Sequence, residues 1–169
     1  YRGRLANDGE HITIVAADGT TVLVDFTFDD ASPWPVDADG IVHDHVGGLA
    51  DIEAKRVRFI GDANQRIAED CLRILRFFRM HAAYGAGEPD RAGYLACIDG
   101  RAGLSNLSAE RVRMEMLKLL IAEGAAVAVQ AMADAGLLLP IFGGVAYTGA
   151  FAAMIAVERA LGLPPNAVR

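Results

Sequence analysis

The sequence is poor in cysteine and lacks the cysteine spacings typical of a zinc site or a disulfide framework. Its 169 residues include only Cys71 and Cys97, with no C-x-x-C pair and no histidine beside either one. Zinc sites need several cysteines or histidines at close spacing, and disulfide-stabilised secreted domains need several cysteines. We therefore interpret both cysteines as small buried hydrophobic residues.

Long hydrophobic runs are also missing. The longest apolar stretches, such as residues 137–142 and 150–157, are far shorter than the roughly 20 residues that a helix needs to cross a bilayer. The N-terminus has no charged region followed by an apolar one, which a signal peptide would have. We expect a cytoplasmic protein with no membrane partner.

Positive charge is in deficit over the whole chain. There are 16 Lys and Arg residues against 22 Asp and Glu residues, and the net charge is −6. Sequence-independent affinity for nucleic acid needs many positive groups facing the phosphates. Any contact with a nucleotide or a nucleic acid must therefore be local.

The order of hydrophobic patterns predicts a mainly α fold of the α+β class, with a short N-terminal β segment before a helical bundle. Residues 11–28 alternate apolar and polar side chains around an Asp-Gly pair, which is typical of two strands joined by a tight turn. Residues 41–61 predict a short strand, a turn at Gly47-Gly48, a short helical piece and a second short strand. Helical periodicity then predicts helices at residues 63–84, 90–98, 108–122, 125–136 and 148–161, the third with Ser108 as its N-cap. Both ends look unfinished, which favours a fragment of a larger protein.

The stretch "RIAEDCLRILRFFR", residues 66–79, concentrates four arginines in an acidic chain. On one continuous helix, the core face would consist of Ile67, Cys71, Ile74, Leu75, Phe78 and Ala82. A second stripe would consist of Arg66, Asp70, Arg73 and Phe77. That stripe would present a carboxylate between two guanidiniums, with an aromatic ring one turn further along.

This second stripe has two interpretations. A carboxylate only accepts hydrogen bonds and a guanidinium only donates them. An Asp-Arg pair one turn apart therefore matches a base edge that offers an amino donor beside an acceptor, as cytosine and adenine do and uracil and guanine do not. The other interpretation is a ladder of solvated ion pairs, worth about 0.2–0.5 kcal/mol each. The spacing alone favours the ion pairs, because exposed pairs are common.

A longer signature extends through the helical part of the sequence. "DHVGG", "RFIGD" and "RIAEDCLRILRFFR" follow one another, and "LSAERVRMEMLKLL" and "AMADAGLLLP" come later. Over about residues 40–165 this pattern resembles the bacterial CCA-adding tRNA nucleotidyltransferase and poly(A) polymerase family, the class II nucleotidyltransferases. The resemblance implies a remnant of the nucleotidyltransferase head in residues 1–40. It further implies a neck with nucleotide-template and RNA-binding helices in residues 41–123 and a partial helical body in residues 124–169.

The resemblance also implies a nucleotide-binding set. The family's E-D-x-x-R element pairs with the incoming CTP or ATP, and it corresponds here to Glu69, Asp70 and Arg73. Asp70 and Arg73 would read the base, in agreement with the base-edge argument. The remaining members that we predict are Arg66, Arg76 and Asp25.

Two further groups of residues are expected beside this set. Arg111, Glu115 and Lys118 form a charged helical stripe, in which Arg111 and Glu115 would help to frame the neck pocket; the alternative is again solvated ion pairs. A flexible turn is implied at Asp44, Gly47 and Gly48, where His45 replaces the proline of the family pattern.

The sequence departs from the family pattern in its N-terminal part. "LVDFTFDDA" keeps Asp25 and the two residues after it, but Leu23 and Val24 replace two arginines and Asp29 replaces an asparagine. The family's Gly-Gly-x-Val-Arg-Asp turn followed by a D-x-D pair, which binds two Mg²⁺ ions, does not occur as a combined pattern. We therefore expect no catalytic and no metal-binding residue in this chain, and Mg²⁺ only in the intact family enzyme. His43 and His45 suggest a metal site, but no third ligand accompanies them.

The functional expectation is a fragment of an enzyme that adds C and A nucleotides to tRNA 3′ ends from CTP and ATP, inactive by itself. The choice between CCA, partial additions and poly(A) stays open, as does the oligomeric state. The alternative is a non-catalytic helical module that binds a nucleotide or a protein through the same face, and a purely structural helical domain is a third possibility.

Overall fold

The computed structural model describes residues 10–15, 22–28 and 44–167, and the chain forms two compact units, Tyr1–His45 and Val46–Arg169. The first unit contains strands β1 (Glu10–Val15) and β2 (Val22–Phe28). The two strands pair antiparallel, with Ile12 opposite Phe26. The strand pair predicted from the alternating pattern is therefore confirmed.

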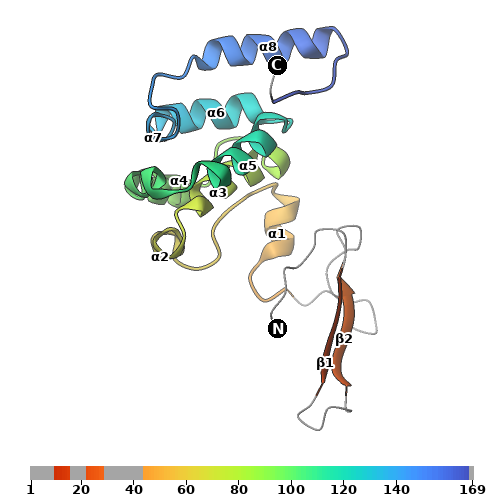
Figure 1. Cartoon of the computed structure of the whole chain (residues 1–169). Helices are drawn as coiled ribbons and strands as arrows, with labels where there is room; N and C mark the ends of the chain where they lie inside the picture. The colour runs from red at the N-terminus through yellow and green to blue at the C-terminus, as the bar shows by residue number, and fades with distance from the viewer. Residues whose placement is uncertain (1–9, 16–21, 29–43, 168–169) are drawn as a thin grey trace. The chain divides into compact units, whose positions relative to one another are not determined.

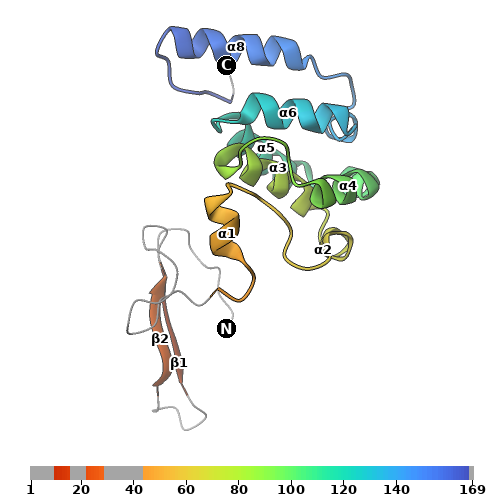
Figure 2. The ribbon, with the colours of Figure 1, turned by 180° about the vertical axis from the view of Figure 1, so that it is seen from behind.

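The second unit is helical, as Figures 1 and 2 show from opposite sides. Its elements are α1 (Gly48–Glu53), α2 (Ala63–Glu69), α3 (Leu72–Tyr84), α4 (Arg91–Asp99), the 3-10 helix η1 (Arg101–Asn106), α5 (Ala109–Leu120), α6 (Ala125–Asp134), α7 (Leu139–Phe142) and α8 (Thr148–Ala160). In both views α6 lies between α8 and the layer that contains α3 and α5. The mainly α class is confirmed.

Helix α3 supplies the centre of the core. Its Ile74, Leu75 and Phe78 side chains are fully buried, and it packs against both α5 and α6. The start of α6 approaches α3 closely, because the Gly124 N–H donates to the Ala82 carbonyl at 2.9 Å. A Cβ at Gly124 would lie 2.9 Å from that same oxygen, so this crossing needs glycine.

The prediction of one long helix over residues 63–84 is wrong, because the helix is interrupted between α2 and α3. Asp70 has an extended backbone (φ −156°, ψ 106°) and ends α2. Its carboxylate accepts a hydrogen bond from the Leu72 N–H at 3.1 Å. Short polar side chains that bond a nearby N–H compete with the helical ladder in this way. Periodicity could not detect the break, because apolar spacing continues across it.

Two smaller predictions are also wrong. Phe77 does not belong to an exposed stripe: it is 4% exposed, and its ring stacks on Phe59 with the ring centroids 5.3 Å apart. The second short strand before residue 61 does not form, since residues 56–60 have no regular structure. The strand predicted before Gly47 lies outside the described residues.

The remaining helical predictions are confirmed within a few residues. The Ser108 hydroxyl accepts from the Arg111 N–H and caps α5, as expected. Cys97 is fully buried, and burial raises the pKa of its thiol to about 12, whereas Cys71 is only partly buried. Among the described helices, none is long and apolar enough to pass through a bilayer.

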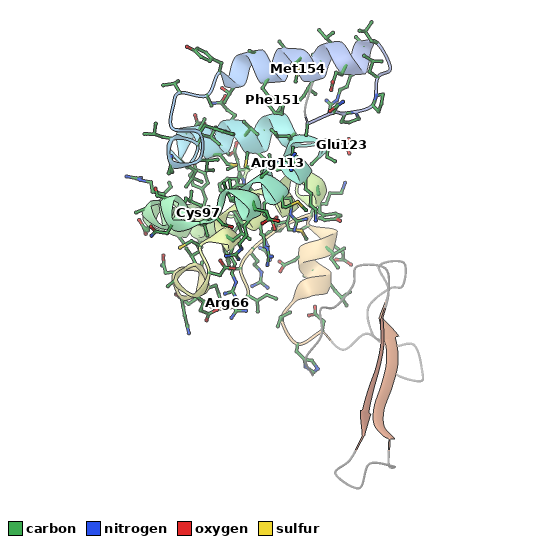
Figure 3. All side chains as sticks on the ribbon, viewed as in Figure 1. Arg66, Cys97, Arg113, Glu123, Phe151 and Met154 are labelled. Atoms are coloured by element: carbon green, nitrogen blue, oxygen red, sulfur yellow. The ribbon has the colours of Figure 1, made fainter. Side chains whose placement is uncertain are left out.

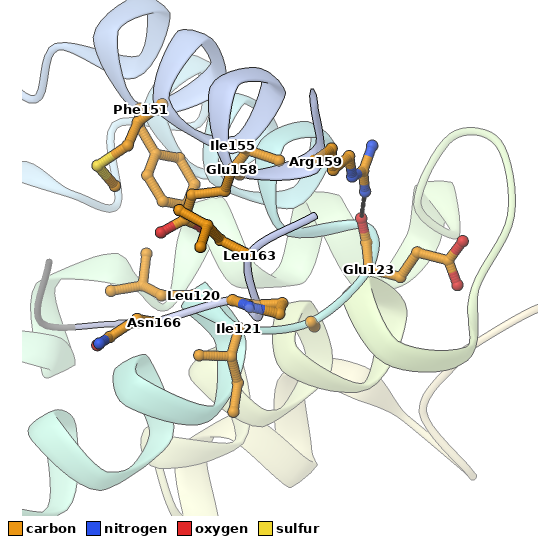
Figure 4. Close-up of a pocket in the computed structure, with 12 residues that line it drawn as sticks. Leu120, Ile121, Glu123, Phe151, Ile155, Glu158, Arg159, Leu163 and Asn166 are labelled. Carbon is orange, nitrogen blue, oxygen red and sulfur yellow. Dashed lines mark hydrogen bonds between the residues drawn. The ribbon is translucent and has the colours of Figure 1, made fainter. Parts of the chain in front are cut away.

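Helix α8 packs on α6 and leaves a hollow beneath its C-terminal end. Phe151 lies between α8 and α6 (Figure 3). The hollow has a volume of about 280 Å³ and lies between α8 and the connection from α5 to α6, where Arg159 Nη2 donates to the Glu123 carbonyl at 2.9 Å (Figure 4). None of the residues predicted to bind a nucleotide lines it.

Candidate functional site

The break between α2 and α3 places the Asp70 side chain at the meeting point of three helices. One carboxylate oxygen, Oδ1, accepts from the Leu72 N–H at 3.1 Å and so caps the start of α3. The other, Oδ2, accepts from Arg111 Nη2 of α5 at 2.8 Å. The side chain remains 28% exposed. Asp70 is thus fixed in position and still open to solvent.

These contacts keep Asp70 in its ionised, acceptor-only form. Partial burial raises the pKa of Asp70, but the Leu72 N–H and the Arg111 guanidinium together outweigh burial. The charge of Arg76 acts in the same direction. The pKa therefore lies below the ordinary value of 3.8, and at neutral pH the group can only accept hydrogen bonds.

Arg73 is held by a different carboxylate. Its Nη1 donates to the Arg66 carbonyl at 2.8 Å and to Glu69 Oε2, which also accepts from Arg66 Nη1 at 3.0 Å. The hydrogen bond from Arg73 is the main reason why the pKa of Glu69 lies below its ordinary value. The prediction that Asp70 stands between two guanidiniums is wrong, because Glu69 occupies that position. Because the helix is interrupted at Asp70, the carboxylates of Glu69 and Asp70 contact different arginines.

Glu115 of α5 joins α3 through two arginines. Its Oε1 accepts from Arg76 Nε at 3.0 Å and its Oε2 accepts from Arg79 Nε at 2.7 Å. The Glu115 side chain is 11% exposed, so this carboxylate is not part of a solvated stripe. Arg111 and Glu115 each contact a member of the predicted nucleotide-binding set, and their framing of a neck pocket stays a prediction.

The predicted flexible turn leads into α1. Gly47 has a left-handed backbone (φ 76°) and is the N-cap of α1, a conformation that glycine adopts at no steric cost. The turn is closed by Arg58, whose Nη2 donates to the Val46 carbonyl and whose Nε donates to Asp51, both at 2.6 Å. Asp51 also accepts from Arg56 Nε at 2.8 Å. Asp44 and Gly48 lie within the described residues on either side of Gly47.

Sequence reasoning missed two members of these clusters. Arg79 was left without a role, although it shares Glu115 with Arg76, and Asp51 was not recognised as the partner of Arg56 and Arg58. The contacts of Asp51 could have been predicted from the sequence, because Asp51, Arg56 and Arg58 lie within eight positions. The contact between Arg79 and Glu115 could not have been predicted, since the two residues are 36 positions apart.

Asp25 lies in β2, opposite Thr13, and its side chain is outside the described part of the structure.

The described residues contain no group of three or more His, Cys, Asp or Glu side chains that could hold a metal ion. The carboxylates of the candidate site have arginine partners. They present an arrangement for hydrogen bonding to a polar ligand, not a ligand set for Mg²⁺.

Comparison with known proteins points to one family throughout. Residues 96–148 match the family model described as "Probable RNA and SrmB- binding site of polymerase A". The mitochondrial CCA tRNA nucleotidyltransferase 1 of Mus musculus is 37% identical over 122 residues, which are 63% of this chain and 27% of that protein. The CCA-adding enzyme of Lactobacillus johnsonii is 39% identical over 103 residues, 60% of this chain and 25% of that enzyme.

The fold agrees with the sequence matches. A crystal structure of the Bacillus stearothermophilus CCA-adding enzyme in complex with CTP is similar to this chain with a TM-score of 0.56 and 32% identity. The similarity covers 60% of this chain and 26% of that one. These matches support the CCA-adding enzyme and poly(A) polymerase family for this chain. The chain spans about a quarter of the length of the Mus musculus and Lactobacillus johnsonii relatives.

The matches confirm the resemblance that the E-D-x-x-R signature indicated. The helical class is that of the matched part of the CCA-adding enzyme structure. The division into head remnant, neck and partial body stays a prediction, as do the roles of individual residues. The described helices from Val46 onward form one compact unit, within which the proposed neck and body would be continuous.

Proposed function

We propose that this chain is the base-selecting and RNA-contacting part of a tRNA nucleotidyltransferase that adds C and A nucleotides to tRNA 3′ ends. The observation that carries the proposal is the geometry at the α2–α3 break. There Asp70 and Arg73, an acceptor and a donor three residues apart, are each fixed by a partner of their own, Arg111 and Glu69 respectively. The relatives named as CCA-adding enzymes, and the CTP complex of one of them, support the same conclusion.

The two side chains retain the hydrogen-bonding capacity that base selection needs. Each Asp70 oxygen accepts one hydrogen bond within the protein, and a carboxylate oxygen can accept about two. Arg73 uses Nη1 for its two contacts, and the described residues offer no hydrogen bond to its Nη2 or Nε. Asp70 can therefore accept from the N4 amino group of cytosine or the N6 amino group of adenine, while Arg73 donates to N3 or N1.

The same pair would disfavour uracil and guanine. Both bases place a carbonyl where Asp70 needs a donor and an N–H where Arg73 needs an acceptor. Two buried or partly buried mismatches of this kind leave polar groups unpaired, which costs about 1–3 kcal/mol each. Selection of C and A thus follows from fixed protein groups and needs no nucleic acid template.

The chemical step belongs to the whole enzyme. Mg²⁺ bound by a nucleotidyltransferase head would activate the 3′ hydroxyl and stabilise the leaving pyrophosphate. The residues described here would position the base of CTP or ATP and contact the RNA. Which product the whole enzyme makes depends on parts of the protein beyond this site.

Titration calorimetry of this chain with CTP, ATP, UTP and GTP tests the proposal. We expect CTP and ATP to bind more tightly than UTP and GTP, and Asp70→Ala to remove the difference. The matched control is Asp99→Ala, which removes an exposed carboxylate at the end of α4 and should leave the preference intact. Equal affinity for all four nucleotides in the unaltered chain would refute base selection by this site.

A further inference from the structure

Tyr84 is an exposed aromatic residue at the C-terminal end of α3. It is 66% exposed, and the described residues offer it neither a hydrogen bond nor a contact with another ring. Tyr94 is placed differently: its ring packs edge-on against Phe78, and its hydroxyl donates to the Ala131 carbonyl at 3.2 Å. The fold therefore uses the ring of Tyr94 for packing and leaves the ring of Tyr84 in contact with solvent.

Tyr84 shares one face of α3 with Arg73. At about 100° per residue, positions 73, 80 and 84 lie within about 20° of a common line along the helix. Met80, between the other two, is 37% exposed. Because a helix rises about 1.5 Å per residue, Tyr84 lies about 16 Å from Arg73 along the axis. A line of accessible side chains thus leads from the proposed base reader to the Tyr84 ring.

Other aromatic rings in the described part of the chain do not lie on this line. Phe77 is covered by Phe59, on which it stacks. Phe142 and Tyr147 are 57% and 81% exposed, but they belong to α7 and to the segment before α8. Among the described residues, Tyr84 is therefore the exposed aromatic residue on the helix that carries Arg73.

A lysine is fixed beside the turn that follows Tyr84. The Ala86 N–H donates to the Lys55 carbonyl at 3.0 Å, which ties the end of α1 to the end of α3. Lys55 has a left-handed backbone (φ 47°) and an exposed side chain, and no carboxylate among the described residues pairs with it. The tie therefore brings an uncompensated positive charge to the region of the Tyr84 ring.

An exposed aromatic ring with a cation nearby suits an unpaired nucleotide. Every base has a π face that can stack on an aromatic side chain, and a positive group holds the neighbouring phosphate. A base inside a duplex is already stacked, whereas bases of single-stranded ends can be splayed onto a protein ring. This surface therefore fits the single-stranded end of an RNA better than its helical stem.

We propose that Tyr84 is a stacking platform for an unpaired base of the RNA, and that Lys55 contacts a phosphate next to that base. The inference rests on the proposed function in taking RNA as the ligand. At about 3.4 Å per nucleotide, the 16 Å between Arg73 and Tyr84 correspond to about five stacked nucleotides. The platform thus receives an upstream nucleotide of the RNA and does not contact the incoming CTP or ATP.

The test compares two fluorescently labelled RNA hairpins by anisotropy, one with a single-stranded 3′ extension of about five nucleotides and one without an extension. Tyr84→Ala should weaken binding of the extended hairpin at least about fivefold, the equivalent of about 1 kcal/mol. Binding of the hairpin without an extension should not change. Tyr84→Phe keeps the ring and should keep the affinity.

The dependence on KCl concentration separates the ring from the lysine. Tyr84→Ala removes no phosphate contact, so the slope of log K against log salt should stay the same. Lys55→Gln should reduce that slope by about 0.7, the value for one phosphate contact on a single strand. An unchanged slope in Lys55→Gln would overturn the phosphate contact.

The matched control is Tyr147→Ala, which removes an even more exposed tyrosine from a different part of the helical unit. It should leave the affinity for both hairpins unchanged, and circular dichroism melting checks that each variant is folded. An equal loss in Tyr84→Ala and Tyr147→Ala, or no loss in Tyr84→Ala, would overturn the platform.

The platform and base selection can fail separately. Calorimetry with CTP should give the same affinity for Tyr84→Ala as for the unaltered chain, whereas Asp70→Ala tests the choice of base. If the unaltered chain binds neither hairpin, the RNA contact of the proposed function fails together with the platform. If it binds the extended hairpin and Tyr84→Ala binds equally well, only the platform fails.

Discussion

Two carboxylate–arginine clusters in the helical unit look alike in composition and differ in how they are built. Asp51 accepts from Arg56 and Arg58, which lie five and seven positions further along the chain. Glu115 accepts from Arg76 and Arg79, which lie 39 and 36 positions before it. The first cluster closes one short segment around α1, whereas the second joins two helices of the core.

The difference shows which ion pairs matter for the site. A local pair orders the segment that contains it and is worth little when exposed. A pair between distant segments fixes the relative position of helices, and the Arg111–Asp70 pair, 41 positions apart, does the same for α5 and the α2–α3 break. The long-range clusters are therefore the ones that hold the predicted nucleotide-binding residues in place.

The largest expected effect is on stability, through Glu115→Ala. The change leaves Arg76 and Arg79 without their shared carboxylate and removes the polar connection between α3 and α5. We expect the free energy of unfolding to fall by about 2 kcal/mol, because hydrogen bonds to a poorly exposed charged group are lost. Urea unfolding followed by circular dichroism measures the change.

Asp51→Ala is the local counterpart of that experiment. Both arginine partners lie five and seven positions from Asp51, so this cluster does not join two core helices, and the loss of stability should be clearly smaller than for Glu115→Ala. Equal losses in the two variants would mean that sequence separation does not distinguish the clusters.

A second effect is expected on selectivity, through Arg111→Met. Methionine fills much of the same space without donating to Asp70 Oδ2, so the carboxylate keeps only the Leu72 N–H as an anchor. The preference for CTP and ATP over UTP and GTP should narrow about three- to tenfold, the equivalent of one hydrogen bond. Calorimetry with the four nucleotides measures it. An unchanged preference would show that Arg111 does not position the base reader.

The sequence predicted the elements of the fold better than the geometry of the site. Helical periodicity and the Ser108 cap located α4, α5, α6 and α8, because those signals are local. The break at Asp70 was missed, since it depends on a single side chain capping α3 while the apolar spacing continues unchanged. Phe77 was misplaced for the same reason: a continuous helix would point it outward, but the actual chain stacks it on Phe59.

The candidate site was predicted as a set of residues and not as a set of contacts. The E-D-x-x-R signature identified Glu69, Asp70 and Arg73 in advance. That Glu69 holds Arg73 and that Arg111 holds Asp70 follows from the turn between α2 and α3 and from the packing of α5. The Arg111–Asp70 contact cannot be deduced from spacing along one helix, whereas Glu69 and Arg73 stand at the i,i+4 spacing of a helical ion pair and could have been paired from the sequence.

A third, smaller effect concerns pH. The folded pKa of Asp70 lies below its ordinary value of 3.8, so its ionised form stabilises the folded chain at all pH values above that value. The stabilisation is lost as the pH falls through the folded pKa. The difference in unfolding free energy between the unaltered chain and Asp70→Asn should therefore be constant from pH 7 to about 5 and shrink below 3.8. Urea titrations at each pH measure it, and a difference that changes between pH 7 and 5 would contradict the assignment.

The smallest effect is expected from Asp51→Asn on RNA binding. The substitution leaves Arg56 and Arg58 uncompensated and adds positive charge to the surface, but it does not add a fixed pair of guanidiniums. Affinity for a fluorescently labelled RNA hairpin with a single-stranded 3′ end should rise slightly at low salt and return to that of the unaltered chain near 0.15 M salt, where charges are screened beyond about 8 Å. A gain that persists at that salt concentration would show that the freed arginines contact the RNA directly.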